Sequence, residues 1–371
     1  MDRRRRRGGP SLTTVVTTAA VAYGTYRLAS WVFDNWNGNN NEDEENERHE
    51  PEAMRSMPAR SLRPSYATVD RRTRQVRRMQ CRVETAKALN DFLPTLKKIL
   101  EERTNFSGET RQLKQLRVTP QLESSISKSD LWNAIQLKSV TRLVATAYSY
   151  TLLSLTLNVQ LHLLGARLLQ QQQQQQQQEA NENDSGFDDS TSRHKIVLTR
   201  TLDEFFQQSV PSLVEVLMKT IKEALVDWDV TDTTSLEITS DKFQEKLTQI
   251  RMTMEQNPLI TFIVPESDKA QETGDINPIA KYILDETWDI MESPAWEVAE
   301  RDALDAVFHI VRSQGWDPAI FGSDQEESKP LAVVVTKLRH TVTDVFYKNE
   351  GLFAELDRLP SVIELGQVSF Y

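Results

Sequence analysis

The sequence predicts an all-α protein, a twisted bundle of long helices with an N-terminal single-pass membrane anchor. Three observations predict this class. Apolar residues recur through most of the chain at the 3.6-residue spacing of one helix face. Only 12 glycines and 14 prolines occur among 371 residues, so turns are few and helices are long. An uncharged run from Ser11 to Tyr26 follows the arginine block Arg3–Arg7, as in an anchor behind a basic N-terminus.

Residues 1–34 form the basic N-terminus and the expected anchor. The uncharged run is shorter than the ~20 residues that span a bilayer, but Arg27 can extend its side chain to the surface and Trp31 suits the interface. Two alternatives stay open. The same features fit a secretory signal with Ala20-Val21-Ala22 before its cleavage site, or a transit peptide rich in Arg and Thr. Either alternative makes the chain a secreted or organelle-imported helical adaptor with a cleaved N-terminal signal.

Charge is unevenly distributed along the chain. Residues 35–80 form a polar linker, acidic at first, and then a basic membrane-proximal segment, whereas most of the rest is acidic and the net charge is −10. A basic front and an acidic body suit a solvated domain carried beside a membrane. No nucleic-acid partner is expected, because the acidic body repels phosphate. Cys81 is the only cysteine, so the chain forms no intramolecular disulfide, and a reducing compartment is expected.

Residues 81–371 form the predicted helical-bundle domain. Its first helix carries an apolar stripe interrupted by Pro94, where we expect a bend or a helix start. Ser129 or Asp130 is expected to cap the next helix, beginning at Leu131. The stripe of the first helix comprises Leu89, Phe92, Leu93, Leu96 and Leu100.

The segment 143–166 contains no charged residue and has the length of a second membrane span. We interpret it instead as a helix buried within the bundle. Asn158, Gln160 and His162 recur with many Thr and Ser residues, and such groups are costly in lipid. We expect these polar groups to bond to neighbouring helices or to water.

After this helix, residues 170–195 combine a glutamine run with an acidic stretch and are predicted to form a disordered loop. Four further apolar stripes predict helices over 206–225, 243–254, 304–311 and 331–346. The apolar segment 259–264 is enclosed by Pro258 and Pro265, and we expect extended coil there.

The sequence carries none of the common catalytic constellations. It has no Gly-rich phosphate loop and no Gly-x-Ser-x-Gly elbow, and its five histidines lack the spacing of a zinc site. The carboxylates between Asp285 and Glu292 suit helix capping and a solvated face. We therefore expect no enzyme activity, no cofactor, no metal and no small-molecule substrate.

Trp132 is the best candidate for a binding residue, because an aromatic side chain near a helix start can anchor a partner. Periodicity alone favours the simpler role, in which Trp132 covers the end of the bundle. The surrounding sequence resembles the signature helix of the peroxin-3 family. The matching residues are Lys128-Ser129-Asp130-Leu131-Trp132, Ile135, Ser139-Val140-Thr141-Arg142, Ala147-Tyr148-Ser149, Val159-Gln160-Leu161 and Leu164-Gly165.

A second motif resembles the same family in order and spacing. It comprises Leu284-Asp285-Glu286-Thr287, Asp289, Met291-Glu292-Ser293-Pro294 and Trp296. The resemblance covers about Thr85 to Val345. It implies a protein of the peroxisomal membrane, anchored once, with its C-terminal domain in the cytosol, although the positive-inside rule would place Arg3–Arg7 there. It also implies a docking domain for the soluble receptor and chaperone peroxin-19, which supports insertion of peroxisomal membrane proteins.

The resemblance further implies the residues of the docking site. The receptor's N-terminal amphipathic helix would lie in an apolar groove at one end of the bundle. Trp132 matches the central docking tryptophan, and Val333 departs from the family by replacing an expected lysine. The other matching residues are Leu131, Ile135, Lys128, Leu122, Leu331 and Ala332.

Overall fold

A computed structural model describes residues 66–118, 127–178, 197–228, 236–256, 259–263, 278–322, 327–349 and 351–370. Apart from two short strands, the regular elements in these ranges are helices, which confirms the predicted all-α bundle. The expected anchor in residues 1–34, the first part of the linker, and residues 179–195 of the predicted loop lie outside the described residues. The helix before this loop continues to Gln178, so the glutamine run is helical.

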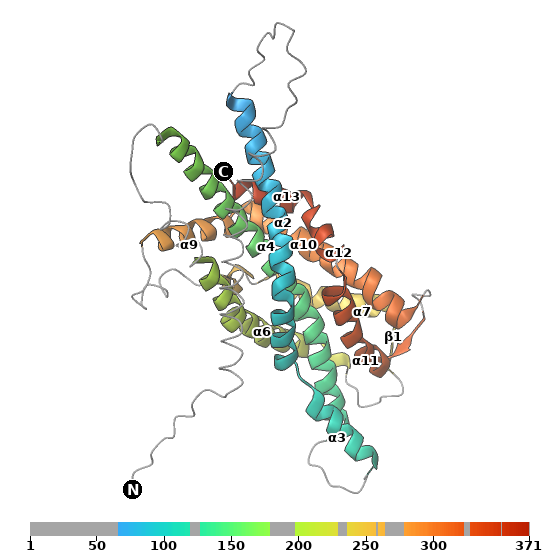
Figure 1. Ribbon diagram of the computed structural model, residues 1–371. Coiled ribbons are helices and arrows are strands. Elements are labelled where there is room, and N and C mark those ends of the chain that lie inside the picture. The colour runs from blue at the N-terminus through green and yellow to red at the C-terminus, as the bar shows by residue number, and fades with distance from the viewer. Residues whose placement is uncertain are drawn as a thin grey trace, which may run out of the picture.

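Two long helices form the axis of the bundle. Helix α2 (Tyr66–Arg103) runs from the upper end of Figure 1 toward α3 (Ser107–Val118), and α4 (Lys128–Gln178) returns along it. Because α2 begins at Tyr66, the end of the segment 35–80 is helical and continuous with the bundle. The exposed Pro94 lies inside α2, so the helix start that the sequence suggests there is absent.

Helix α4 is the core of the molecule. Every residue from 143 to 166 is buried, and the apolar window of α4 that has the length and hydropathy of a membrane span is 89% buried inside the protein. The prediction that its polar groups bond to neighbouring helices is confirmed for Thr146, whose hydroxyl is hydrogen-bonded to that of Tyr347, but is wrong for Thr151 and Thr156. The hydroxyls of Thr146, Thr151 and Thr156 donate to the carbonyl oxygens four residues earlier in α4, at 2.6, 2.9 and 2.7 Å.

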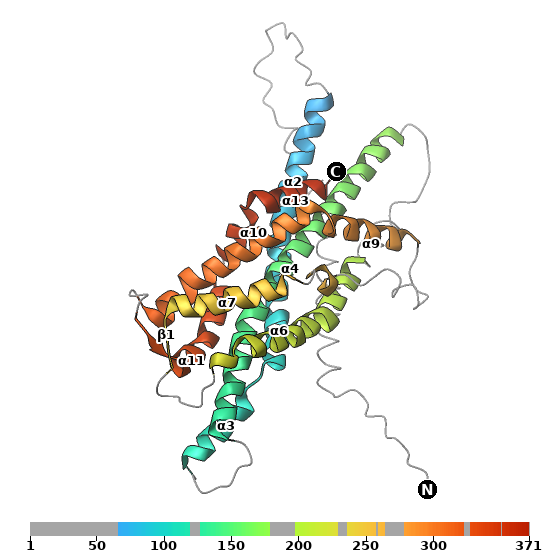
Figure 2. The same cartoon turned by 180° about the vertical axis from the view of Figure 1, so that it is seen from behind.

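The other elements surround α4, with α7, α10 and α11 on one side of the α2–α4 pair and α9 on the other (Figure 2). The four predicted stripes lie in helical segments, whereas 259–264 is not extended coil but begins with a 3₁₀ turn. The remaining elements are η1 (Phe205–Ser209), α6 (Val210–Ala224), η2 (Val226–Trp228), β1 (Glu237–Ile238), α7 (Ser240–Met254), η4 (Leu259–Phe262), α9 (Pro278–Met291), α10 (Pro294–Ile310), η5 (Val311–Phe321), β2 (Lys329–Pro330), α11 (Leu331–Val342), η6 (Thr343–Tyr347), α12 (Gly351–Asp357) and α13 (Pro360–Val368).

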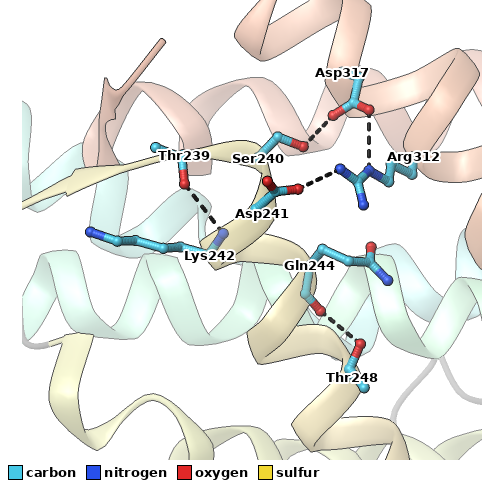
Figure 3. A network of polar contacts seen from close by, with 8 residues as sticks. All are labelled: Thr239, Ser240, Asp241, Lys242, Gln244, Thr248, Arg312 and Asp317. Carbon is cyan, nitrogen blue, oxygen red and sulfur yellow. Dashed lines mark hydrogen bonds and ion pairs between the residues drawn. The ribbon is translucent and has the colours of Figure 1, made fainter. Parts of the chain in front are cut away.

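A buried carboxylate connects α7 to η5. The Ser240 hydroxyl donates to Asp317, and Arg312 donates from Nε to Asp317 at 3.2 Å and from Nη2 to Asp241 at 2.7 Å (Figure 3). Ser240 and Asp317 are both buried, so an unmade hydrogen bond between them would be costly, whereas the pair of Arg312 with Asp241 is exposed. The network fixes the beginning of α7 directly after β1.

Strand β1 in turn positions the start of α11. It pairs antiparallel with β2, and the backbone N–H of Leu331 donates to the carbonyl of Leu236 at 3.1 Å. The contact between α11 and η5 is also close: a β-carbon on Gly315 would lie 2.7 Å from a methyl group of Thr341. The position of Leu331 therefore depends on the network around Asp317.

We predict that Asp317→Ala lowers the free energy of unfolding by about 2 kcal/mol, because it leaves the buried Ser240 hydroxyl and the Nε of Arg312 without their acceptor, while Arg312 keeps its bond to Asp241. Urea unfolding of the full-length chain, followed by circular dichroism, measures the change. Asp344→Ala is the matched control, since it removes an exposed pair with Lys348 and should cost less than about 0.5 kcal/mol. Equal effects of the two substitutions would contradict the role assigned to Asp317.

Candidate functional site

The first turn of α4 carries most of the predicted site residues. The helix begins at Lys128, and Ser127 is its cap, so the expectation of a cap at Ser129 or Asp130 is wrong. The Ser127 hydroxyl accepts from the Asp130 N–H at 3.0 Å, and the Asp130 carboxylate accepts from the Ser127 N–H at 3.1 Å. This reciprocal pair is a capping box, and it holds the first turn in a defined position.

The helical spacing separates these residues into two groups. Leu131 and Ile135 face the core and are 3% and 5% exposed. Trp132 is half-buried and packs against the edge of the core, and Lys128, one turn earlier on the same side, is exposed. Trp132 thus offers part of a large ring at the surface, while the rest of its side chain packs against the core.

Helix α11 brings the second predicted group to the same end of the bundle. The ring centroids of Tyr150 and Phe346 lie 5.6 Å apart, and Arg142 and Arg339 line one small cavity, so α11 runs parallel to α4. Leu331 lies eight residues before Arg339, which is about 12 Å along a helix. The residue of α4 at the same distance before Arg142 is Ala134, in the second turn of that helix. Leu331 therefore lies near the level of the first turns of α4.

The exposure of the α11 residues changes along its first turn. Leu331 is buried, Ala332 is half-buried, and Val333 is 38% exposed. Val333 places an apolar side chain at the surface where the family resemblance implies a lysine. Leu122 lies outside the described residues, so its predicted place in the site stays a prediction.

A bracket of polar contacts, absent from the sequence predictions, holds the end of α2 and the start of α3 against α4. Arg142 donates from Nε to the Thr104 hydroxyl and from Nη2 to the Thr104 carbonyl, both at 2.8 Å, and its guanidinium lies 5.0 Å from the Phe106 ring centroid. Lys138 donates to the Asn105 carbonyl at 2.8 Å and pairs with Glu109 at 2.5 Å. The sequence gives one sign of this role: Arg142 is the last charged residue before the long uncharged segment 143–166.

The described part of the chain has no arrangement suited to catalysis at this end. Within it, no group of three or more His, Cys, Asp or Glu side chains is placed to hold a metal ion. Burial raises the pKa of Cys81 to about 12, so its thiol stays protonated at neutral pH. The site offers an aromatic ring, apolar neighbours and a cationic rim, which are binding features.

His162 in α4 is neutral at physiological pH. Burial lowers its pKa from 6.5 to about 4, and the Arg82 and Arg78 charges act in the same direction, whereas the hydrogen bond to the Asn158 carbonyl and the Asp357 charge oppose the shift. Because its folded pKa is depressed, the unfolded chain binds the proton more tightly. This residue therefore stabilises the fold fully above pH 6.5, and its contribution is lost as the pH falls toward 4.

We predict that lowering the pH from 7 to 4.5 reduces the unfolding free energy of wild type by about 2.5 kcal/mol more than that of His162→Gln. The reason is that only wild type must accept a proton at this position on unfolding. Urea unfolding at both pH values measures the two differences, and subtracting them removes the other titrating groups. The same pH dependence in both proteins would show that the buried imidazole does not set it.

The family model described as Peroxin-3 matches residues 37–344, which include both motifs, α4 and the start of α11. No curated protein matches the chain.

Proposed function

The chain belongs to the peroxin-3 family of peroxisome biogenesis factors, which is not an enzyme family, and from this membership we propose that it is a docking factor of the peroxisomal membrane. It receives the peroxin-19 receptor through that receptor's N-terminal amphipathic helix. Receptor docking then brings newly made membrane proteins to the bilayer, where they insert. The partners are therefore the receptor helix and, through the N-terminal anchor, membrane lipid.

The observation that carries this proposal is the half-buried Trp132 at the end of the bundle. Its side chain packs against the core to which the buried Leu131 and Ile135 belong, and Leu331 of α11 lies near the same level. A rigid aromatic group with an exposed part binds an apolar helix face at small entropic cost. Lys128 on the rim is placed to meet a carboxylate of the incoming helix, as charged rims orient a partner.

Val333 replaces a charged side chain by an apolar one at the edge of the proposed site. A lysine there would contribute a screened charge contact, whereas Val333 contributes exposed apolar area next to Ala332. Docking in this chain therefore depends more on apolar contact and less on ionic strength than docking with a lysine at this position.

We predict that Trp132→Ala weakens binding of a peptide of the receptor's N-terminal helix by about 2 kcal/mol or more, because a central anchor is lost. Calorimetry with the full-length chain in detergent micelles measures the affinity. Trp288→Ala is the matched control: this half-buried tryptophan of α9 has its indole bonded to Glu292 and lies on another face. Its affinity should equal that of wild type, with both variants folded by circular dichroism.

Two results would overturn the assigned site. The first is an unchanged affinity of Trp132→Ala, and the second is an equal loss in the Trp288→Ala control. Absence of binding by the folded wild type would overturn the docking function itself.

The family places the protein at the peroxisomal membrane, and its orientation there is part of the proposal. The single buried Cys81 is a free thiol, which suits a reducing compartment such as the cytosol.

We predict that protease added to intact peroxisomes digests the helical domain. An epitope on the C-terminus reports the cleavage, and a matrix enzyme serves as the protected control. A C-terminal epitope that survives until detergent is added would contradict the cytosolic orientation.

A further inference from the structure

A second candidate site lies far from Trp132, where α2, α4, α12 and α13 meet. A cavity of about 220 Å³ is lined there by Arg78, Arg82, Asn158, His162, Asp357 and Gly366, among others. Asn158 follows Trp132 by 26 residues of one helix, which corresponds to about 39 Å. The cavity exceeds the ~150 Å³ space that holds a benzene molecule in an engineered protein core, so it has room for a small organic ligand.

The floor of this cavity presents hydrogen-bond acceptors. Asn158 is 5% exposed, and its Oδ1 accepts no hydrogen bond within the described part of the chain. His162 Nδ1 lies 2.8 Å from the Asn158 carbonyl oxygen, so Nδ1 carries the proton. Since the low pKa of His162 keeps the ring neutral, its Nε2 is an acceptor.

Gly366 lets α13 approach this floor closely, so that the Asn158 Oδ1 atom is itself buried. A β-carbon built on Gly366 would lie 3.0 Å from Asn158 Oδ1 and 3.0 Å from His162 Nε2. Any larger residue at this position would therefore cover both acceptors. A buried acceptor that receives no hydrogen bond costs free energy. The floor therefore favours a ligand whose hydroxyl groups can donate to it.

The mouth of the cavity is positively charged. Arg82 donates from Nε to the Asp357 carboxylate at 2.8 Å and from Nη2 at 2.6 Å, so these two charges compensate each other. Arg78 adds a positive charge at the lining, and the flanking turns of α2 carry further arginines. The local charge attracts an anion, and guanidinium groups bind phosphate oxygens well.

We propose that this cavity binds a small phosphorylated polyol, with its hydroxyl groups donating to Asn158 and His162 on the floor and its phosphate at Arg78 on the rim. Such a group occurs both as a free metabolite and as the headgroup of an inositol lipid. The site is separate from the docking end, so this inference stands or falls independently of receptor binding.

The test is calorimetry of inositol 1-phosphate with the full-length chain in detergent micelles. Asn158→Leu removes the floor acceptor, and Arg78→Gln removes the rim charge. Each should weaken binding about tenfold or more, the loss expected when a hydrogen bond to a charged or buried group is removed. Arg71→Gln is the matched control, because the exposed Arg71 lies on the same helix outside the lining and carries the same charge.

A further variant guards against misfolding at the buried position. Gln75→Trp changes an exposed residue at the mouth, and it should block binding while circular dichroism and peptide docking stay unchanged. Nanodiscs then distinguish the source of the ligand. Preference for phosphatidylinositol over phosphatidylserine, lost in Gln75→Trp, assigns the lipid headgroup, whereas binding of inositol 1-phosphate without this preference assigns the free metabolite.

Three results would overturn the proposal. One is no binding of either form by the folded wild type. Another is an equal loss in Arg71→Gln and Arg78→Gln, which would indicate general attraction to a basic helix. The third is unchanged affinity in both Asn158→Leu and Gln75→Trp, which would place the ligand outside the cavity.

Discussion

The burial of α4 is the constraint on which the rest of the structure depends. This helix has 51 residues, and its uncharged part is covered on all sides, so α2, α3, α6, α9, α10, α11 and α13 all pack against it. A buried helix must satisfy its polar side chains without water. Thr146, Thr151 and Thr156 do so on the backbone of α4 itself, and Thr146 also bonds to Tyr347.

Function is expected where this coverage ends. At the start of α4, the capping box at Ser127 and the bracket at Arg142 hold a half-buried tryptophan at the surface. Toward the other end, Asn158 and His162 lie beneath Gly366, where α13 offers no side chain to cover them. One helix thus carries both of the sites proposed for partners, and the network around Asp317 positions α11 beside the first of them.

The sequence was sufficient for the helices, because an apolar stripe at helical spacing needs no knowledge of its partner. Trp132 and its neighbours are proposed as the site mainly through the family resemblance, and this stays a prediction. The sequence failed where tertiary contacts decide. Pro94 is tolerated inside α2, and the parallel register of α4 and α11 depends on contacts between residues almost 200 positions apart. The cap at Ser127 is missed for another reason, because it is a local pair with Asp130 and the sequence suggests the cap at Ser129 or Asp130 itself. The cavity beneath Gly366 is likewise invisible in the sequence, since it requires α13 to approach α4 at a glycine.

Hydrogen–deuterium exchange of the full-length chain, with and without the receptor's N-terminal helix, tests the docking account most directly. Backbone amides exchange more slowly where a partner covers and stabilises them. We expect protection in the first turns of α4, around Trp132, and at the start of α11, around Leu331. Protection confined to α2 and α13, or no change along the chain despite bound peptide, would contradict the assignment of the docking site to this end of the bundle.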